Sequence, residues 1–315
     1  MEKIKLGVSA CLLGEKVRYN GGHKRELFLT DTLGRFVELV GVCPEAECGL
    51  GVPREAMRLE GDPEGPRLMT VRSRKDLTAR LAFWAQKRVR ELEAENLWGF
   101  IFKSNSPSCG AARVKVYGEK GGPVKKGMGL FARAFMAHFP LTPMEDEIRL
   151  HDPDRRENFI DQVFTLKRWR EMVAQKPGLG NLMTFHTRHK YLIMAHSPRR
   201  HQLLGRLAAQ GNEIPLKELY ARYLGLLLEA LGLKATVKKH ANVLLHLLGY
   251  FKKALSPEEK EELLEIIENY RQGRVPLIAP VTLCNHYARK YRQPDLMEQY
   301  YLNPHPVELH LRNHV

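Results

Sequence analysis

Cysteines that follow predicted β-strands are the most informative residues of this 315-residue chain. Three of the five stand in that position: Cys11 after residues 5–9, Cys43 after residues 36–42, and Cys109 in the loop after residues 98–103. The carboxyl ends of parallel strands share one edge of a sheet, and ligands bind at that edge. We therefore expect these three thiols, which are far apart in the sequence, to meet at one place.

Three thiols at one place suit a soft metal centre, because sulfur ligands select iron–sulfur clusters, zinc or Cu(I). When three cysteines hold a four-iron cluster, one iron keeps an open position and can act as a Lewis acid. Placement alone leaves a second interpretation open, in which the cysteines are simply buried at strand ends. Of the other two cysteines, Cys48 is expected to be a free or buried thiol, with a fourth-ligand role as the alternative, and Cys284 to belong to a core.

The elements that must position these cysteines alternate between strand and helix in the first half of the chain. A helical pattern covers residues 76–96, where apolar residues recur at spacings of three and four. The expected strands are residues 5–9, 36–42, 67–72, 98–103 and 114–117. This alternation predicts an α/β domain with a mainly parallel sheet.

Helical periodicity replaces the β patterns after residue 156. The expected helices are residues 157–172, 185–209, 215–231, 237–255, 257–271 and 281–291. Ser256 and Pro257 give the clearest helix start, an N-cap followed by proline at the first helical position. We predict an α/β domain at residues 1–155, a helix and linker at 156–180, and a basic all-α C-terminal domain at 181–315.

Four short sequence blocks surround the cysteines in order. They are Ser-Ala-Cys-Leu-Leu-Gly at 9–14, Val-Arg-Tyr-Asn-Gly-Gly at 17–22, Cys-Pro-Glu at 43–45 with Gly-Leu at 49–50 and Pro-Arg at 53–54, and Ser-Pro-Ser-Cys-Gly at 106–110. Over roughly residues 3–150 the chain resembles the thiouracil desulfidase family. The resemblance implies an α/β fold and a [4Fe-4S] cluster with three cysteine ligands and one open iron. It also implies hydrolytic, non-redox removal of sulfur from a thiolated uracil.

The resemblance assigns roles to individual residues. The implied ligands are Cys11, Cys43 and Cys109, the acid–base residue is Glu45, and the catalytic serine is Ser104. A thiocarbonyl sulfur is soft and suits an open iron, and Glu45 could activate the attacking water. Glu45 could instead be an exposed loop acid, and a serine of this loop could instead be a cap. The chain departs from the family pattern at Asn20, where aspartate is usual, and at Cys48.

Three basic residues near the cysteine blocks are candidates for contact with a substrate phosphate: Arg18, Lys24 and Lys103. Lys103 could also neutralise the cluster. The alternative for each is an ordinary surface position.

The net charge of +14 favours a polyanionic partner such as nucleic acid. Acidic residues are absent between Glu171 and Glu213, between Glu229 and Glu258, and between Glu268 and Asp295. These windows interleave basic and aromatic residues, as an RNA-binding surface does. The candidate RNA-binding residues are Arg188, Lys190, Arg199, Arg200, Lys238 and Lys239. Basic helices that are merely solvated are the alternative.

Histidines cluster in the first of these windows, but we do not expect a metal site at His186, His189 and His196, because no carboxylate accompanies them in the sequence. Residues 185–198 resemble a helical domain of unknown function that is often fused to the desulfidase domain. Such fusions imply thiolated tRNA as the substrate, notably 4-thiouridine.

Two rival functions stay open, a desulfidase of free thiouracil or thionucleosides and a non-catalytic iron–sulfur protein that binds nucleic acid. No apolar stretch approaches the roughly 20 residues of a membrane span, and no signal peptide is evident. We therefore expect a cytoplasmic protein without a membrane partner.

Overall fold

The computed structural model describes residues 3–118, 122–175 and 177–314, which form two compact units. The units are Met1–His151 and Asp152–Val315. The first unit ends at His151, whereas we expected its end at residue 155, and the helix that we assigned to the connecting segment belongs to the second unit. Lys176, in the expected linker, lies outside the described residues.

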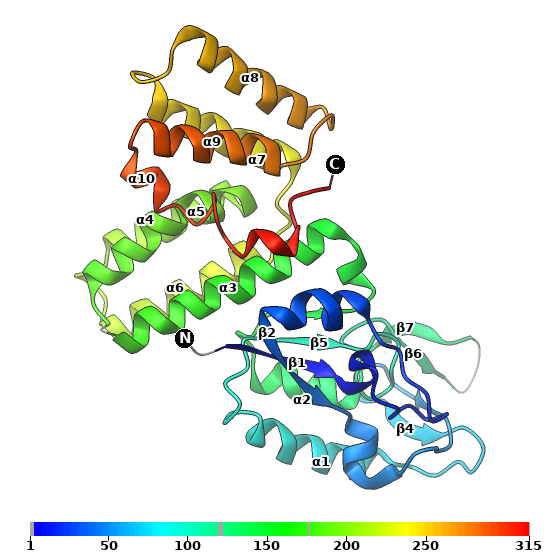
Figure 1. Cartoon of the computed structure of the whole chain (residues 1–315). Helices are drawn as coiled ribbons and strands as arrows, with labels where there is room; N and C mark the ends of the chain where they lie inside the picture. The colour runs from blue at the N-terminus through cyan, green and yellow to red at the C-terminus, as the bar shows by residue number, and fades with distance from the viewer. Residues whose placement is uncertain (1–2, 119–121, 176, 315) are drawn as a thin grey trace. The chain divides into compact units, whose positions relative to one another are not determined.

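A four-stranded, fully parallel sheet forms the centre of the first unit (Figure 1). Its strands lie in the order β2 (Val37–Val42), β1 (Ile4–Ser9), β5 (Gly99–Phe102) and β8 (Met144–Asp146). The register pairs Ser9 with Val42 and Phe102 with Asp146, so neighbouring strands end at the same edge. The sequence predicted the first three strands and missed β8, because Met-Glu-Asp carries no β pattern.

A second sheet of four strands completes the β structure of the first unit. Its order is β4 (Arg67–Thr70), β3 (Met57–Glu60), β6 (Val114–Tyr117) and β7 (Val124–Gly127). β3 is antiparallel to β4 and parallel to β6, and β7 is antiparallel to β6. The sequence predicted β4 and β6 but not that they form a sheet apart from the cysteine-bearing strands.

Two helices cover the parallel sheet, α1 (Thr78–Glu91) and α2 (Leu130–His138) (Figure 1). Ala85 and Val89 of α1 pack with Phe131 and Phe135 of α2 against the buried β5 ring of Phe100. The Phe100 and Phe135 ring centroids lie 4.6 Å apart. Full burial of each such side chain contributes about 1.5–3 kcal/mol, so this aromatic core fixes β5 and the loop that follows it.

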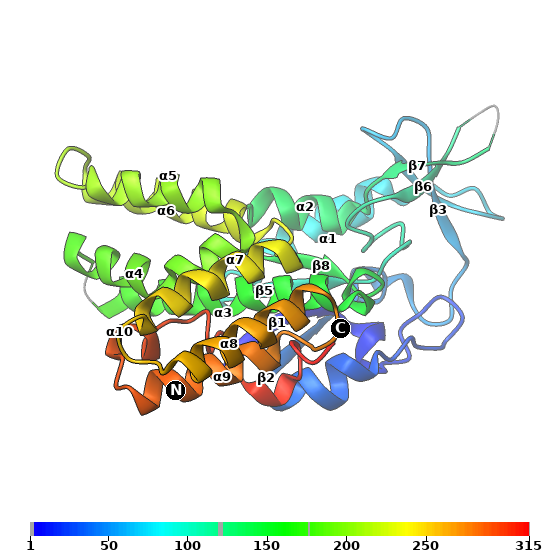
Figure 2. The same cartoon turned by 90° about the horizontal axis from the view of Figure 1, so that it is seen from above.

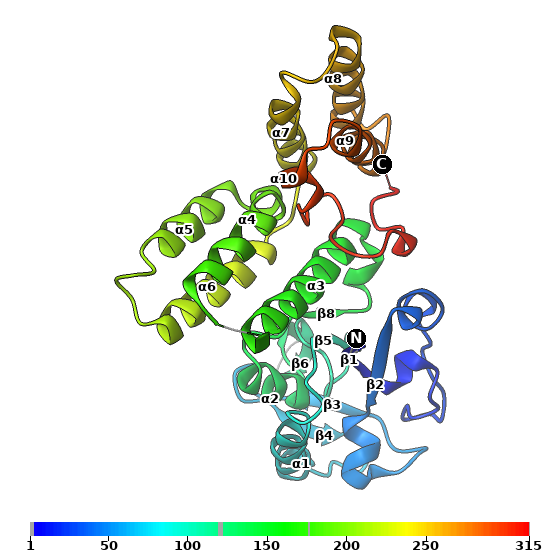
Figure 3. The ribbon, with the colours of Figure 1, turned by 60° about the vertical axis from the view of Figure 1, so that its left-hand side comes forward.

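The described part of the second unit contains helices and turns but no strand, as predicted. In Figures 2 and 3, α4, α5 and α6 form one group of neighbouring helices and α7, α8 and α9 form another, in agreement with their contacts. The helices are α3 (Pro153–Gln175), α4 (Leu179–His196), α5 (Pro198–Ala209), α6 (Leu216–Leu231), α7 (Val237–Leu248), α8 (Pro257–Arg271), α9 (Ile278–Lys290) and α10 (Pro294–Met297). None of the described helices combines the length and apolar character needed to cross a membrane.

Two predicted helices of this unit are wrong in extent. Residues 237–255 were expected to be continuous, but α7 ends at Leu248 and a 3₁₀ turn follows at Gly249–Phe251. Residues 185–209 were expected to be continuous, but they are divided between α4 and α5 at Ser197. The Ser197 side chain accepts a hydrogen bond from the Arg200 backbone N–H, and Pro198 is the first residue of α5. An N-cap and a proline at the first helical position start a new helix here, as they do at Ser256, where the expected start is confirmed with a full capping box.

Candidate active site

The carboxyl edge of the parallel sheet carries the residues of the site. Cys11 lies in the 3₁₀ turn that follows β1, and Cys43 directly follows β2. Lys103 begins the loop that follows β5, and Cys109 ends it. Glu147 directly follows β8. Each of the four parallel strands therefore delivers at least one chemically active side chain to the same edge.

All of these side chains except Glu147 line one cavity of about 360 Å³. Every site residue that the sequence predicted for the α/β domain is among its lining residues: Cys11, Cys43, Cys109, Glu45, Ser104, Arg18, Lys24 and Lys103. Arg54, Ser106 and Ser108 line it too. The structure therefore brings the predicted set together.

Cys11 and Cys109 are buried, and Cys43 is partly buried. The pKa of Cys11 is raised to about 11, first by burial and then by the Cys43 thiol, although Lys103 and Arg18 act in the opposite direction. Burial also raises the pKa of Cys43 and of Cys109, most strongly at Cys109. Such thiols stay protonated at neutral pH unless a metal takes the place of the proton.

The separation of the three sulfur atoms bears on the kind of metal centre. Within the described part of the chain they do not all lie within 4.8 Å of one another. A tetrahedral zinc ion with Zn–S bonds of about 2.3 Å would hold its sulfur ligands about 3.8 Å apart. The sulfur atoms are therefore farther apart than the ligands of one zinc ion, and three thiols beside two cations form a donor set that suits an iron–sulfur cluster.

The remaining two cysteines lie elsewhere. Among the described residues that line the cavity, Cys48 is not found. Its thiol contacts the Glu45 carbonyl oxygen at 3.4 Å, and its side chain packs against a small apolar core. Cys284 is buried in α9, where burial raises its pKa to about 12.

Glu45 is held by two partners inside the cavity. Its Oε2 accepts hydrogen bonds from Arg54 Nε at 2.9 Å and Arg54 Nη2 at 2.5 Å. Its Oε1 accepts a hydrogen bond from Ser108 Oγ at 2.6 Å. Only 6% of the Arg54 side chain and 13% of the Glu45 side chain are exposed. The carboxylate is therefore fixed next to Cys109, rather than free in a loop.

Ser104 also lines the cavity and is held by a second polar network. Its Oγ donates to Glu147 Oε1 at 2.8 Å and accepts from Lys103 Nζ at 3.1 Å. The Ser104 backbone N–H donates to Glu147 Oε2 at 2.7 Å, and Lys103 and Glu147 form an ion pair. Glu147 is buried, so it fixes both the serine hydroxyl and the lysine.

Two residues of these networks, Arg54 and Glu147, were not predicted to have a role. Both stand in blocks that the family resemblance covers, Arg54 after Pro53 and Glu147 in the acidic run at 145–147. An acid that directly follows a strand of a parallel sheet is a signal that could have revealed Glu147, had β8 been predicted.

The candidate RNA-binding residues of the second unit differ in their surroundings. Arg199 and Lys238 are exposed, and neither forms an ion pair with another residue of the described ranges. The other four already have partners. These are Glu298 for Arg188, the Tyr250 hydroxyl for Lys190, Glu229 for Arg200, and the carbonyl oxygens of His196 and Lys234 for Lys239.

The fold and site define an α/β domain with a buried three-cysteine centre at the carboxyl edge of a parallel sheet. The 2-thiouracil desulfurase family model matches residues 6–147, and a family model described as a protein of unknown function, DUF1722, matches residues 190–306. The protein YbbK of Bacillus subtilis, itself described as uncharacterized, is 31% identical over 115 residues, which is 34% of this chain and 74% of YbbK. The chain belongs to the 2-thiouracil desulfurase family.

Two further proteins are similar to this chain. The uncharacterized protein YbgA of Escherichia coli is 29% identical over 158 residues, which cover 50% of this chain and 94% of YbgA. The solved structure of the [4Fe-4S]-dependent thiouracil desulfidase TudS is 31% identical, covering 48% of this chain and 95% of that one with a TM-score of 0.39.

Proposed function

We propose that this protein removes sulfur from thiolated uracil in tRNA, converting 4-thiouridine to uridine and releasing sulfide with the help of a [4Fe-4S] cluster. The observation that carries the proposal is the convergence of three thiols and Glu45 on one cavity. Membership of the 2-thiouracil desulfurase family supports the reaction class. The basic helical unit supports a nucleic-acid substrate, which would place the protein in the cytoplasm.

Cys11, Cys43 and Cys109 would hold the cluster. When bound, it would supply a Lewis-acidic iron that binds the thiocarbonyl sulfur and polarises the carbon–sulfur bond. Arg18 and Lys103 lower the pKa of Cys11, so they favour the thiolate that a metal needs. Water provides the oxygen that replaces sulfur at the ring carbon, and its two protons leave with the sulfide, so the reaction needs no oxidant or reductant.

Glu45 would act as the general acid–base group that transfers these protons. Its carboxylate is anchored by Arg54 on one oxygen and by Ser108 on the other, which fixes its direction within the cavity. A carboxylate held in this way can take a proton from the attacking water and return it to the departing sulfur. Ser108 also contacts the Cys109 sulfur at 3.9 Å, so the acid–base group and a ligand share one hydrogen-bond network.

Ser104 is placed to orient the base. Its hydroxyl proton points to Glu147 and one lone pair accepts from Lys103. A hydroxyl oxygen has two lone pairs, and the second accepts only a long hydrogen bond from Asn105 Nδ2 at 3.4 Å, which the N–H of a uracil ring can replace. Lys103 is held beside the serine by Glu147 and faces the same cavity, where it can meet developing negative charge.

The proposal is tested by anaerobic incubation of the reconstituted protein with bulk tRNA, followed by nucleoside analysis. We expect 4-thiouridine to fall and uridine and sulfide to rise together. A parallel reaction with free thiouracil tests whether the free base, rather than tRNA, is the substrate. Turnover of the free base at equal or higher efficiency, with 4-thiouridine in tRNA unchanged, would favour a free-base desulfidase.

A further inference from the structure

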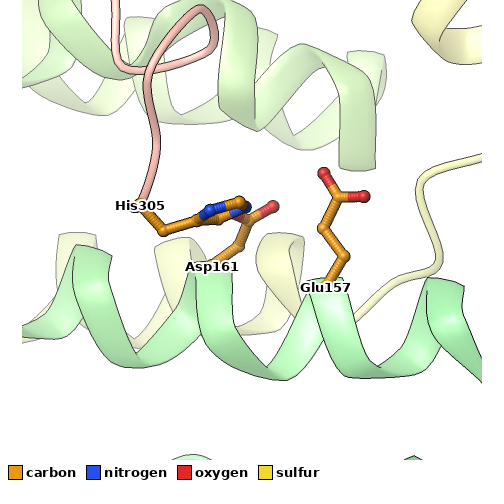
Figure 4. A group of neighbouring side chains, drawn as sticks. All are labelled: Glu157, Asp161 and His305. Carbon is orange, nitrogen blue, oxygen red and sulfur yellow. The ribbon is translucent and has the colours of Figure 1, made fainter. Parts of the chain in front are cut away.

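A second cluster of possible metal ligands lies within the helical unit, apart from the cysteine cavity. Glu157 and Asp161 stand four residues apart on α3 and therefore on one face of it. His305, from the C-terminal segment, completes the group, and the three ligand atoms lie within 4.8 Å of one another. Figure 4 shows the His305 ring turned toward Asp161, with Glu157 one turn along the helix.

The cluster is closed to solvent, and two of its atoms have no hydrogen-bond partner. The exposed fractions of the side chains are 9% for Glu157, 3% for Asp161 and 4% for His305. Asp161 Oδ1 and His305 Nε2 are both buried, and neither has a hydrogen-bond partner among the described residues. Leaving a buried polar atom unpaired is unfavourable, and more so for a charged group.

The two unpaired atoms face each other at 4.0 Å, which is too far for a hydrogen bond. Zinc binds imidazole nitrogen and carboxylate oxygen at about 2.0–2.2 Å, so a tetrahedral zinc ion would hold two such atoms about 3.3–3.6 Å apart. The two atoms are therefore within roughly half an ångström of the separation that a single ion of this kind imposes.

The proton on His305 is placed as in a metal-ligating histidine. Its Nδ1 lies 3.2 Å from the Pro306 carbonyl oxygen, which can only accept, so Nδ1 carries the proton and the Nε2 lone pair faces Asp161. Histidines that bind metals commonly donate the other ring N–H to a backbone carbonyl.

The other groups around the cluster leave room for a cation. Arg312 donates to Glu157 Oε1 at 2.7 Å, and its charge also acts on Asp161, so two buried carboxylates share one arginine. His196 Nε2 lies 3.4 Å from Asp161 Oδ2, on the far side of the carboxylate from His305. His305 and Arg312 also line a neighbouring cavity of about 410 Å³.

We propose that Glu157, Asp161 and His305 bind one zinc ion, which fastens the C-terminal segment to α3. One imidazole and two carboxylates form a ligand set that zinc accepts, whereas magnesium and calcium prefer oxygen alone. The site is independent of the cysteines and of the proposed desulfuration.

The test is the metal content of the full chain, purified anaerobically without an affinity tag and dialysed against micromolar Zn²⁺. We expect one zinc per chain beside the cluster iron. His305→Gln and Glu157→Gln should each weaken zinc binding at least about 100-fold and keep the iron, because loss of a ligand exceeds the roughly 10–100-fold effect of an outer partner. His310→Gln, at an exposed histidine of the same segment, should keep both metals.

Circular dichroism checks that each variant is folded, and hydrogen exchange of residues 299–314 in the wild type gives a readout that needs no variant. Zinc should slow exchange in this segment. Wild-type protein without zinc, or folded His305→Gln and Glu157→Gln proteins that retain it, would overturn the proposal. Zinc that is lost with Cys11→Ala but kept in His305→Gln would assign the ion to the cysteines instead.

Discussion

Replacement of Glu45 by glutamine separates the chemical role of this residue from its structural one. Glutamine keeps the shape but loses the charge, so the reaction loses its acid–base group, and we expect turnover to fall by about 10²–10⁴-fold. Stability should fall as well. Arg54 is only 6% exposed and would be left as a buried charge without its carboxylate, which costs about 3–5 kcal/mol.

A double variant distinguishes the two effects. Arg54→Met in the Glu45→Gln background removes the unpaired charge, so most of the lost free energy of unfolding should return while activity stays low. Glu47→Gln is a matched control, because Glu47 lies in the same turn but does not line the cavity, and a glutamine oxygen can still accept the Cys43 N–H. We expect its turnover to stay within a few-fold of wild type.

The measurements are anaerobic turnover of a thiolated uracil substrate, iron content and urea denaturation. Near-normal turnover of Glu45→Gln protein with a full complement of iron would refute the acid–base role. If Arg54→Met restored activity together with stability, Glu45 would be a structural residue whose loss merely disturbs the site.

Three further predictions concern other parts of the molecule. Alanine at any of the three ligand cysteines should abolish the iron content, whereas Cys48→Ala and Cys284→Ala should keep it; iron analysis decides. Arg199→Ala combined with Lys238→Ala should weaken tRNA binding. The slope of log K against log salt concentration should also flatten by roughly one unit for each phosphate that is no longer neutralised, which a binding series across salt concentrations measures. Arginine partners lower the pKa of Glu60 from 4.5 to about 2, so its stabilising effect is full above pH 4.5 and is lost toward pH 2. In the Glu60→Gln variant the free energy of unfolding should depend less on pH over that interval, as denaturation at a series of pH values would show.

The cysteine site could be predicted because it depends on local patterns. Each cysteine follows a run of β-forming residues, and the geometry of a parallel sheet brings such positions to one edge. The partners of Glu45 and Ser104 could not be predicted in the same way. Arg54 and Glu147 reach the site only after the chain has folded, and Glu147 follows a strand with no β pattern.

In the helical unit the periodicity predicted that helices form but not where each one ends. The sequence pattern of Ser197 and Pro198 carries the same start signal as Ser256 and Pro257, yet the apolar periodicity continues across it. Pairs of residues that are distant in the sequence were out of reach as well. No carboxylate is near His196 in the sequence, and we therefore expected no metal site there. In the fold, however, Asp161 lies next to this histidine.

Replacement of sulfur by oxygen from water on a uracil of tRNA is the reaction on which the proposed function depends. The most direct test is a single anaerobic reaction of the reconstituted full-length protein with 4-thiouridine-containing tRNA in ¹⁸O-labelled water, followed by mass analysis of the nucleosides. We predict that each 4-thiouridine consumed yields one sulfide and one uridine carrying a single ¹⁸O atom. Unchanged 4-thiouridine, or uridine formed without the label, would contradict the proposed reaction.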